Sequence, residues 1–213
     1  MSRVIRPDDV VNVDSMSLTE RQEGIDNESK SWVPIIKGKG DPYYTPITQY
    51  IDWSKDSISG IRKDGLIRNK RYYFEEGIFI SRGGTGKPVI RYSPPAAVDS
   101  SGGIYIPTYD QVSAKFLNGL LNSSFIQHLI NCFINGTVNT QIQDMRLVPI
   151  VIPTDEQLTR MERLVDEAIS IRVSELNAES TVAELDTTDV GSSRTIADIE
   201  ADIDELVSDI YDS

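Results

Sequence analysis

Short apolar runs separated by turn residues occupy the chain from Trp32 to Tyr109, a pattern typical of β-strands joined by tight connections. Glycine supplies most of the turn positions between the runs. The expected strands are residues 33–37, 50–53, 71–74, 78–81, 89–92 and 104–107. Residues 1–30 are polar and have no apolar period, so we expect a mobile lead-in or the remnant of a division from a larger protein.

Beyond residue 110 the apolar residues follow helical spacing. Val112, Phe116 and Leu120 recur at intervals of four residues, as on one face of a helix. A second, well-buried helix is expected at 125–134, where an Asn-Gly pair ends it. The apolar run 145–153 predicts a short strand closed by proline.

Two acidic helices are expected in the last third of the chain. Thr154, followed by Asp155 and Glu156, starts the first of them in the manner of an N-cap. The second carries an apolar stripe made of Ile196, Ile199, Ile203, Leu206, Val207, Ile210 and Tyr211. The stripe needs a partner surface, which is either this protein's own body or part of a larger assembly.

This order of elements predicts an α+β fold, in which a β-rich domain with two packed helices is followed by a long helix and a C-terminal acidic helix. The expected divisions are a polar lead-in at 1–30, the β-rich domain at 31–153, a helix at 154–180, a linker at 181–194 and an amphipathic acidic helix at 195–213. A chain of 213 residues with 39% hydrophobic residues has room for one ordinary domain and an appendage.

Composition excludes several classes of protein. No run of about 18 apolar residues is present, so we expect no membrane span. Residues 1–14 lack a basic start followed by an apolar stretch, so we expect no secretory signal and a cytoplasmic protein. Cys132 and His128 are the only residues of their types, which excludes a disulfide and a thiolate zinc cluster. Both lie in the apolar stretch 125–132 and are expected at core or half-buried positions.

The net charge of −12 is concentrated in the last part of the chain. Residues 154–213 hold 17 Asp and Glu against 4 Lys and Arg, whereas residues 1–153 are nearly neutral. Nine basic residues and only four acidic ones fall between Ser54 and Tyr92. These cations suit either contacts with nucleic-acid phosphates or the plain solvation of a sheet surface, and charge alone does not separate the two.

Motifs for catalysis are missing from the sequence. The nearest string to the Asn/Asp-Pro-Pro-aromatic loop of methyl transfer to an amine is Ser93-Pro94-Pro95-Ala96, which lacks both the amide and the aromatic ring. The stretch from Ser81 to Pro88 approximates a phosphate-binding loop, but glycine is needed at the first position and Ser or Thr at the last. A hairpin tip that presents Arg82 and Lys87 to a phosphate is the better interpretation.

Six strings, read in order, resemble one protein family. They are Trp32 to Gly38, Tyr50 to Trp53, Tyr72 to Ile78, Leu117 to Ser123, Gly136 to Asp144 and Leu147 to Pro153. Their succession resembles the TaqI-type C-terminal specificity (target recognition) domain of adenine-N6 DNA methyltransferases, as in type IIG restriction enzymes and the methyltransferases of BREX and DISARM phage-defence systems. The stretch from Ile203 to Tyr211 is similar to the C-terminus of the same proteins, although their Tyr-Gly-Leu-like ending is Tyr-Asp-Ser here. The catalytic domain that precedes this region in the family has no counterpart in these 213 residues.

The resemblance implies that this chain is part of a site-specific, adenine-specific DNA methyltransferase rather than a complete enzyme. A partner catalytic domain or subunit, using S-adenosylmethionine, would flip the target adenine and methylate it. This chain, with no catalytic residue, cofactor or metal of its own, would read base edges of double-stranded DNA through the major groove. The residues expected at the DNA are Lys37, Lys39, Arg62, Lys63, Arg68, Lys70, Arg71, Arg82, Lys87, Arg91, Asn139 and Gln141.

Several of these side chains also have a purely structural interpretation. The amides of Asn139 and Gln141 suit adenine, but they suit a turn-capping role at least equally well. The aromatic residues next to the cations are expected mainly in the core. They are Trp32, Trp53, Tyr72 and Tyr73.

Three alternatives remain open. A half-size specificity subunit of a type I restriction system would also contain a long helix after residue 154, although two recognition domains are normal in such a chain. An acidic DNA mimic that inhibits restriction fits the net charge, but a mimic needs carboxylates spread along a face at phosphate spacing rather than gathered in two helical segments. The third alternative is an inactive remnant of a longer gene.

Overall fold

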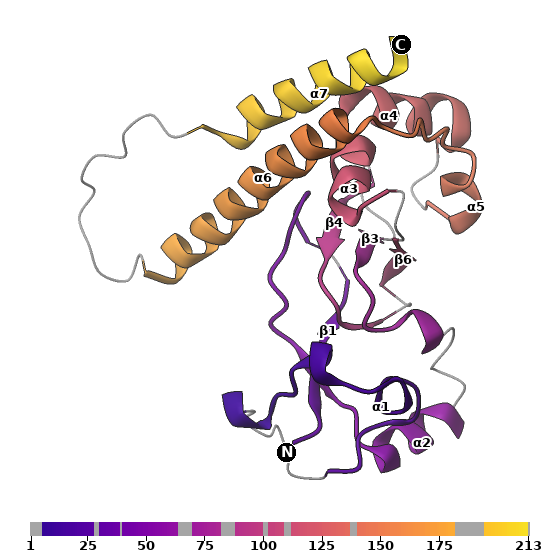
Figure 1. Cartoon of the computed structure of the whole chain (residues 1–213), viewed down its shortest axis with the longest axis vertical. Coiled ribbons are helices and arrows are strands. Elements are labelled where there is room, and N and C mark those ends of the chain that lie inside the picture. The colour runs from indigo at the N-terminus through magenta and orange to yellow at the C-terminus, as the bar shows by residue number, and fades with distance from the viewer. Residues whose placement is uncertain are drawn as a thin grey trace.

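The computed structural model describes most of the chain. The described residues are 6–27, 30–38, 40–63, 70–81, 88–99, 102–108, 112–136, 140–181 and 194–212. Helices and two three-stranded sheets make up these parts, so the predicted α+β class is confirmed. Figure 1 shows a layer of helices at one end, a sheet beneath it, and the second sheet with the N-terminal segment at the other end.

One sheet lies directly under the helices and has β3 (Gly77–Ser81) at its centre. β4 (Ile90–Ser93) and β6 (Gly103–Pro107) flank it, both antiparallel. Ile78 and Ile80 face the helical core, whereas Phe79, on the opposite face of the strand, packs into the second core. Every residue of β3 is buried, which explains its three consecutive large apolar residues, Ile78 to Ile80.

The helical layer covers this sheet through α3 (Ala114–Asn122), α4 (Ser124–Leu129), α6 (Asp155–Thr181) and α7 (Ile196–Asp212). The predicted helix at 125–134 consists of α4 and the π-helical turn η4 (Ile130–Ile134). A side chain at Gly119 would meet the Met161 sulfur at 2.3 Å, so glycine lets α3 and α6 approach closely.

The apolar stripe of α7 is covered by this protein's own helices. Its residues Ile199, Ile203, Leu206, Val207 and Ile210 are buried. α7 contacts α6, α4 and α3, and α6 and α7 run side by side in Figure 1. The partner surface that the stripe needs is therefore part of this chain.

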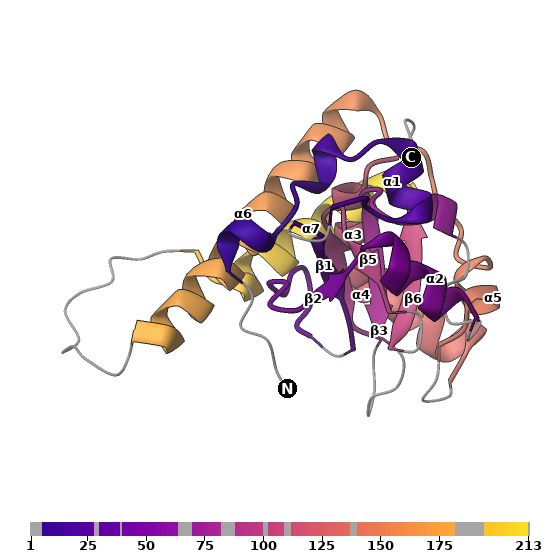
Figure 2. The same ribbon diagram turned by 90° about the horizontal axis from the view of Figure 1, so that it is seen from below.

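The second sheet has β1 (Trp32–Ile36) at its centre, with β2 (Tyr50–Asp52) antiparallel on one side and β5 (Ala97–Val98) parallel on the other. Figure 2 shows these strands beside α1 (Leu18–Glu23) and α2 (Lys55–Lys63). Trp53 and Phe74 are the large side chains of its core, in edge-to-face contact at 5.0 Å between ring centroids.

The expectation of a mobile lead-in is wrong for residues 6–27. Two 3-10 turns, η1 (Pro7–Asp9) and η2 (Val13–Ser15), lead into α1. Val13, Met16 and Ile25 are buried in the second core, where they contact residues far along the chain. The segment has no apolar period because these three residues come from turns and helix flanks rather than from one face of a regular element.

Two local expectations also need correction. The predicted strand 71–74 is the 3-10 turn η3 (Lys70–Tyr72) followed by Phe74 at φ 63°, because its aromatic residues are buried by packing and not by strand pairing. The predicted strand 145–153 begins at the last residue of α5 (Ile142–Met145), continues through a turn and enters no sheet. Helices α1, α2 and α5 and strand β5 had not been predicted.

His128 and Cys132 are exposed, although core or half-buried positions were expected. They lie four residues apart on the outer face of α4 and η4, with 3.6 Å between the Cys132 sulfur and His128 Nδ1. Ile126 and Ile130 occupy the inner face. In the described part of the chain, no helix has both the length and the apolar character needed to cross a membrane.

Candidate nucleic-acid interface

The basic stretch predicted from the sequence is divided among several elements. Arg62 and Lys63 end α2, and Lys70 and Arg71 begin η3. Both elements pack against α1, so these four backbone positions belong to the end of the molecule opposite the acidic helices (Figure 1). Other predicted DNA contacts lie outside the described residues, and these are Lys39, Arg68, Arg82, Lys87 and Asn139.

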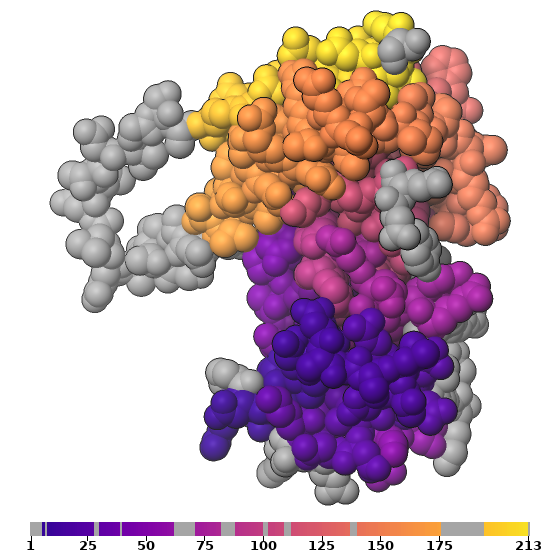
Figure 3. Space-filling view, viewed as in Figure 1, coloured from indigo at the N-terminus to yellow at the C-terminus, as the bar shows by residue number. Residues whose placement is uncertain are grey.

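Figure 3 shows the same separation on the molecular surface. α6 and α7, which follow the break in the charge pattern of the sequence, form one end of the molecule, while the N-terminal segment forms the other. The carboxylates of α6 and α7 therefore lie away from α2 and η3. The segment 6–27 beside those two elements is itself acidic, with Asp8, Asp9, Asp14, Glu20, Glu23 and Asp26 against Arg6 and Arg21, so this end is not uniformly basic. Distance from α6 and α7 lowers the repulsion that their charge would exert on a nucleic acid bound near α2 and η3.

Arg71 is exposed and is oriented by its neighbour. Its guanidinium carbon lies 4.6 Å from the centre of the Tyr72 ring, and Nη2 donates a hydrogen bond to the Tyr72 hydroxyl at 2.6 Å. No carboxylate pairs with Arg71 within the parts of the chain that the structure describes. The other basic side chains nearby, Arg21 and Lys55, form ion pairs with Glu75 and Asp26. Arg71 is therefore the better placed of these cations to meet a phosphate or a guanine edge.

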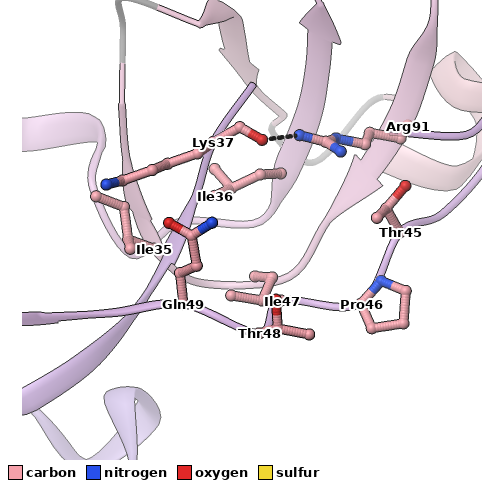
Figure 4. A pocket seen from close by; sticks show the side chains of 9 residues that line it. All are labelled: Ile35, Ile36, Lys37, Thr45, Pro46, Ile47, Thr48, Gln49 and Arg91. Atoms are coloured by element: carbon pink, nitrogen blue, oxygen red, sulfur yellow. Dashed lines mark hydrogen bonds between the residues drawn. The ribbon is translucent and has the colours of Figure 1, made fainter. Parts of the chain in front are cut away.

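A cleft of about 110 Å³ lies between the end of β1 and residues 45–49, and we call it the β1 cleft. Figure 4 shows the side chains of Lys37 and Gln49 at one end of it, and those of Thr45 and Arg91 at the other. Lys37 and Gln49 are exposed. The cleft thus presents an ammonium group and a side-chain amide, the two kinds of donor that contact phosphates and base edges.

Arg91 forms the inner wall of the β1 cleft and not part of an outer surface. Its side chain is 2% exposed, and Nη2 donates hydrogen bonds to the carbonyl oxygens of Lys37 at 2.7 Å and Gly38 at 3.0 Å. The guanidinium also lies over the Phe79 ring at 4.9 Å. A phosphate contact, as expected from the sequence, is not compatible with this buried position.

The environment of Arg91 also explains a neighbouring glycine. Burial lowers the pKa of Arg91 from its usual value, and the carboxylate of Asp41 opposes this effect. A side chain at Gly40 would meet Nη1 of Arg91 at 1.9 Å, so only glycine allows the backbone to pass the guanidinium. Arg91 is therefore a positioning residue, because it holds the end of β1, and with it Lys37, against β4.

Gln141 is exposed and forms a capping box with Asp144 at the start of α5, as the turn-capping interpretation expected. Its N–H donates to Asp144 Oδ2 at 2.7 Å, and the same carboxylate accepts from Asn135 Nδ2 at 2.5 Å. Gln141 is not among the residues that line the β1 cleft. Of the aromatic residues expected in the core, Trp53 and Tyr73 are buried, whereas Trp32 and Tyr72 are only partly so.

Sequence reasoning missed the polar residues that complete the β1 cleft. Thr45, Thr48 and Gln49 come from a connection before β2 that has no charge and no recognisable motif. The Pro-rich, polar composition of the connection marks it only as a loop. Within the described residues, no group of three His, Cys, Asp or Glu is arranged so that it could hold a metal ion.

A second surface is apolar and lies where α4, α7 and the chain after α5 meet. The Phe125 ring contacts the Tyr211 ring at 5.1 Å, and the Tyr211 hydroxyl donates to the Pro149 carbonyl at 2.5 Å. Large apolar side chains around these contacts are exposed. This apolar surface consists of Phe125, Leu147, Ile150, Val151 and Ile152, with exposed fractions of 37% to 67%.

Comparison with known proteins gives one distant relative and no matching family model. The chain is 26% identical over 152 residues to the adenine-specific methyltransferase BrxX of Escherichia coli O9:H4 (strain HS). The aligned region covers 70% of this chain but only 12% of that methyltransferase. The protein is thus distantly related to part of an adenine-specific methyltransferase and spans a small fraction of its length.

Proposed function

We propose that this chain is the DNA-reading module of an adenine-N6 DNA methyltransferase of a restriction-modification or phage-defence system, similar to a TaqI-type specificity domain. The observation that carries the proposal is the match to a short portion of a much longer adenine-specific methyltransferase. The separation of charge supports it, because the basic elements are free of the acidic helices. In this function the chain binds duplex DNA, and methyl transfer from S-adenosylmethionine belongs to a catalytic domain outside these residues.

Within this proposal, Lys37 and Arg71 contact the duplex, while Gln49 and Gln141 are the exposed amides available to base edges. Arg62, Lys63 and Lys70 lie on backbone that is suitably placed beside α1. Phosphate contacts set the register of the protein on the duplex, and base contacts supply the specificity. Arg91 contributes indirectly, since it positions the strand end that carries Lys37.

The catalytic partner has a suitable docking site in the apolar surface. Exposed large apolar residues that gather on one surface commonly mark a site where another protein binds. Most of the related methyltransferase lies outside the region that matches this chain. We therefore assign the apolar surface to the catalytic domain, whether that domain is on the same polypeptide or on another.

Duplex binding tests the proposed function directly. We expect the double substitution Lys37→Ala, Arg71→Ala to weaken binding of a labelled duplex about tenfold at low salt and to reduce the salt slope by about 2, since each phosphate contact contributes about 0.9. Fluorescence anisotropy across a KCl series measures both quantities. Arg163→Ala is the matched control, because Arg163 is an exposed cation on α6, at the acidic end.

Two results would contradict the proposal. One is an unchanged affinity and salt slope in the double variant, which would remove Lys37 and Arg71 from the interface. The other is a chain that binds no duplex but inhibits a restriction complex, which would favour the acidic mimic instead.

A further inference from the structure

The chain that joins α5 to α6 (Figure 1) carries most of the apolar surface, yet it enters neither sheet. Residues 149–154 contain no helix, turn or bend. Pro153 restricts Ile152 to extended backbone conformations, and the β-branched residues Ile150 and Val151 favour the same conformations. The segment therefore has the composition and the conformation of a strand, but the part of the chain that the structure describes provides no strand beside it.

One edge of this segment is held by α7. The Tyr211 hydroxyl donates a hydrogen bond to the Pro149 carbonyl oxygen at 2.5 Å. Burial raises the pKa of Tyr211, and a hydrogen bond from the Val151 backbone opposes this rise. In an extended chain, the backbone groups of every second residue point to the same edge. The backbone groups of Pro149, Val151 and Pro153 therefore belong to the edge that Tyr211 occupies.

The opposite edge is open. It carries the N–H and C=O groups of Ile150 and Ile152, and none of these groups has a hydrogen-bond partner among the residues that the structure describes. Both residues are exposed, Ile152 by 61%, and unpaired backbone groups are rarely buried, so this edge faces water. The next residues on the same edge, Val148 and Thr154, already donate to α5 and to the first turn of α6. The open edge therefore consists of Ile150 and Ile152.

The two prolines of the segment do not block the open edge. Pro149 and Pro153 lack an N–H, but both belong to the edge that Tyr211 occupies, so no donor is missing from the other edge. Proteins usually protect a free strand edge from pairing by a lysine, a proline or a bulge. Here the open edge has two isoleucines instead. An unprotected edge of β-branched residues is suited to pair with a strand of another protein.

The charge next to this segment is mainly negative. Asp155 and Glu156 follow it directly and are exposed, as is Asp212 at the end of α7. Arg146 is the only cation in α5 and in the chain that leads to α6. A second copy of this chain would bring the same carboxylates to the open edge, so their repulsion disfavours pairing between two copies. A segment with basic residues between its apolar ones fits this charge.

We propose that the catalytic domain binds this protein by strand addition, in which one of its extended segments pairs with Ile150 and Ile152. The two residues offer two N–H donors and two carbonyl acceptors to the added strand. Apolar side chains of that strand cover the apolar surface, and its basic side chains meet Asp155 and Glu156. The identity of the partner rests on the proposed function, whereas the open edge is a property of this chain alone.

A synthetic strand tests the pairing without DNA and without the catalytic domain. The probe is the peptide Lys-Val-Lys-Val-Lys-Val-Lys with blocked termini, titrated into the ¹⁵N-labelled chain. We expect saturable shifts of the Ile150 and Ile152 amide resonances and slower hydrogen exchange at both amides. The dissociation constant should be on the order of a millimolar, because so short a pairing is marginal by itself. The same peptide N-methylated at every residue keeps its side chains and charges but lacks the backbone donors, and it should bind at least about tenfold more weakly.

Two substitutions of one residue separate strand pairing from apolar contact. Ile152→Pro removes an N–H from the open edge and suits an extended chain, so it is expected to leave folding intact and to weaken peptide binding about tenfold. Ile152→Ala keeps the N–H and removes an exposed side chain, so it is expected to weaken binding less than about threefold. Equal affinities of the two variants, equal affinities of the two peptides, or no saturable shift would overturn strand addition. Peptide binding by a chain that binds no duplex would contradict the proposed function instead.

Discussion

A single buried guanidinium connects the two sheets. Arg91 belongs to β4 of one sheet, and it donates to backbone carbonyls at the end of β1 of the other. From the sequence it is one of nine cations in a basic stretch, and nothing in that pattern separates it from the exposed ones. Alternation along β4 assigns Arg91 to the face of the sheet opposite Ile90, but that face is exposed to solvent only if no other element covers it. The second sheet covers it, so the position could not be predicted without the tertiary structure.

Substitution of this residue should therefore affect folding more than charge. Arg91→Leu removes the donor of the hydrogen bond to the Lys37 carbonyl oxygen. The substitution is expected to lower the free energy of unfolding by about 1–3 kcal/mol. Urea denaturation followed by tryptophan fluorescence measures the change. Arg71→Leu, at an exposed position, is expected to change it by less than about 0.5 kcal/mol. Equal effects of the two substitutions would show that Arg91 does not have the structural role given to it here.

Individual elements were predicted well where burial and periodicity agree. β3, β4 and β6, and the helices α3, α6 and α7, form close to the expected residues because their apolar residues follow the period of the element. The aromatic run 71–74 is not a strand, because it forms a 3-10 turn followed by Phe74 at positive φ. The apolar run 145–153 begins inside α5 and enters no sheet. The sequence feature that indicates α1 is its capping box, in which Ser17 is followed three residues later by Glu20. The helix has no apolar period.

The cap of α1 makes the stability of the N-terminal segment dependent on pH. Side-chain and backbone hydrogen bonds from Ser17 lower the pKa of Glu20 below its usual value of 4.5. A carboxylate with a depressed pKa in the folded state stabilises the protein above that value, and the contribution is lost as the pH falls below it. Glu20→Ala is expected to lower the free energy of unfolding by up to about 1 kcal/mol at pH 7 and to have little effect at pH 3.

Urea denaturation at the two pH values tests this dependence on Glu20. Glu23→Ala provides the control, because Glu23 lies at the end of the same helix and outside the capping box. A loss of stability in Glu20→Ala that is the same at pH 3 and pH 7 would mean that the carboxylate charge is not what stabilises the cap.

The whole molecule has two chemically different ends. The acidic helices α6 and α7 and the apolar surface lie at one end, and the cation-bearing elements α2 and η3 lie at the other, beside the acidic segment 6–27 (Figure 1). The sequence indicated the separation of charge, because the acidic residues follow residue 154. It did not indicate the apolar surface, because the run 145–153 has the composition of a buried strand and only the fold shows that four of its large apolar residues are exposed. Under the proposed function, the end with α2 and η3 binds DNA and the end with the apolar surface binds the catalytic domain.

Association with a catalytic polypeptide is the test of that arrangement. Tagged chain 1–213 is expected to recover from its source cells a polypeptide that carries a glycine-rich methyl-donor turn and an Asn-Pro-Pro-aromatic loop, identified by mass spectrometry. Ile152→Asp places a charge in the apolar surface, at a residue 61% exposed, and is expected to reduce recovery at least about tenfold without unfolding the chain. Leu18→Asp makes the same kind of change at a residue 69% exposed on α1, at the other end, and should leave recovery unchanged. Equal recovery by both variants would place the partner elsewhere, and recovery of polypeptides without a methyl-donor site would contradict the assignment of the apolar surface to a catalytic domain.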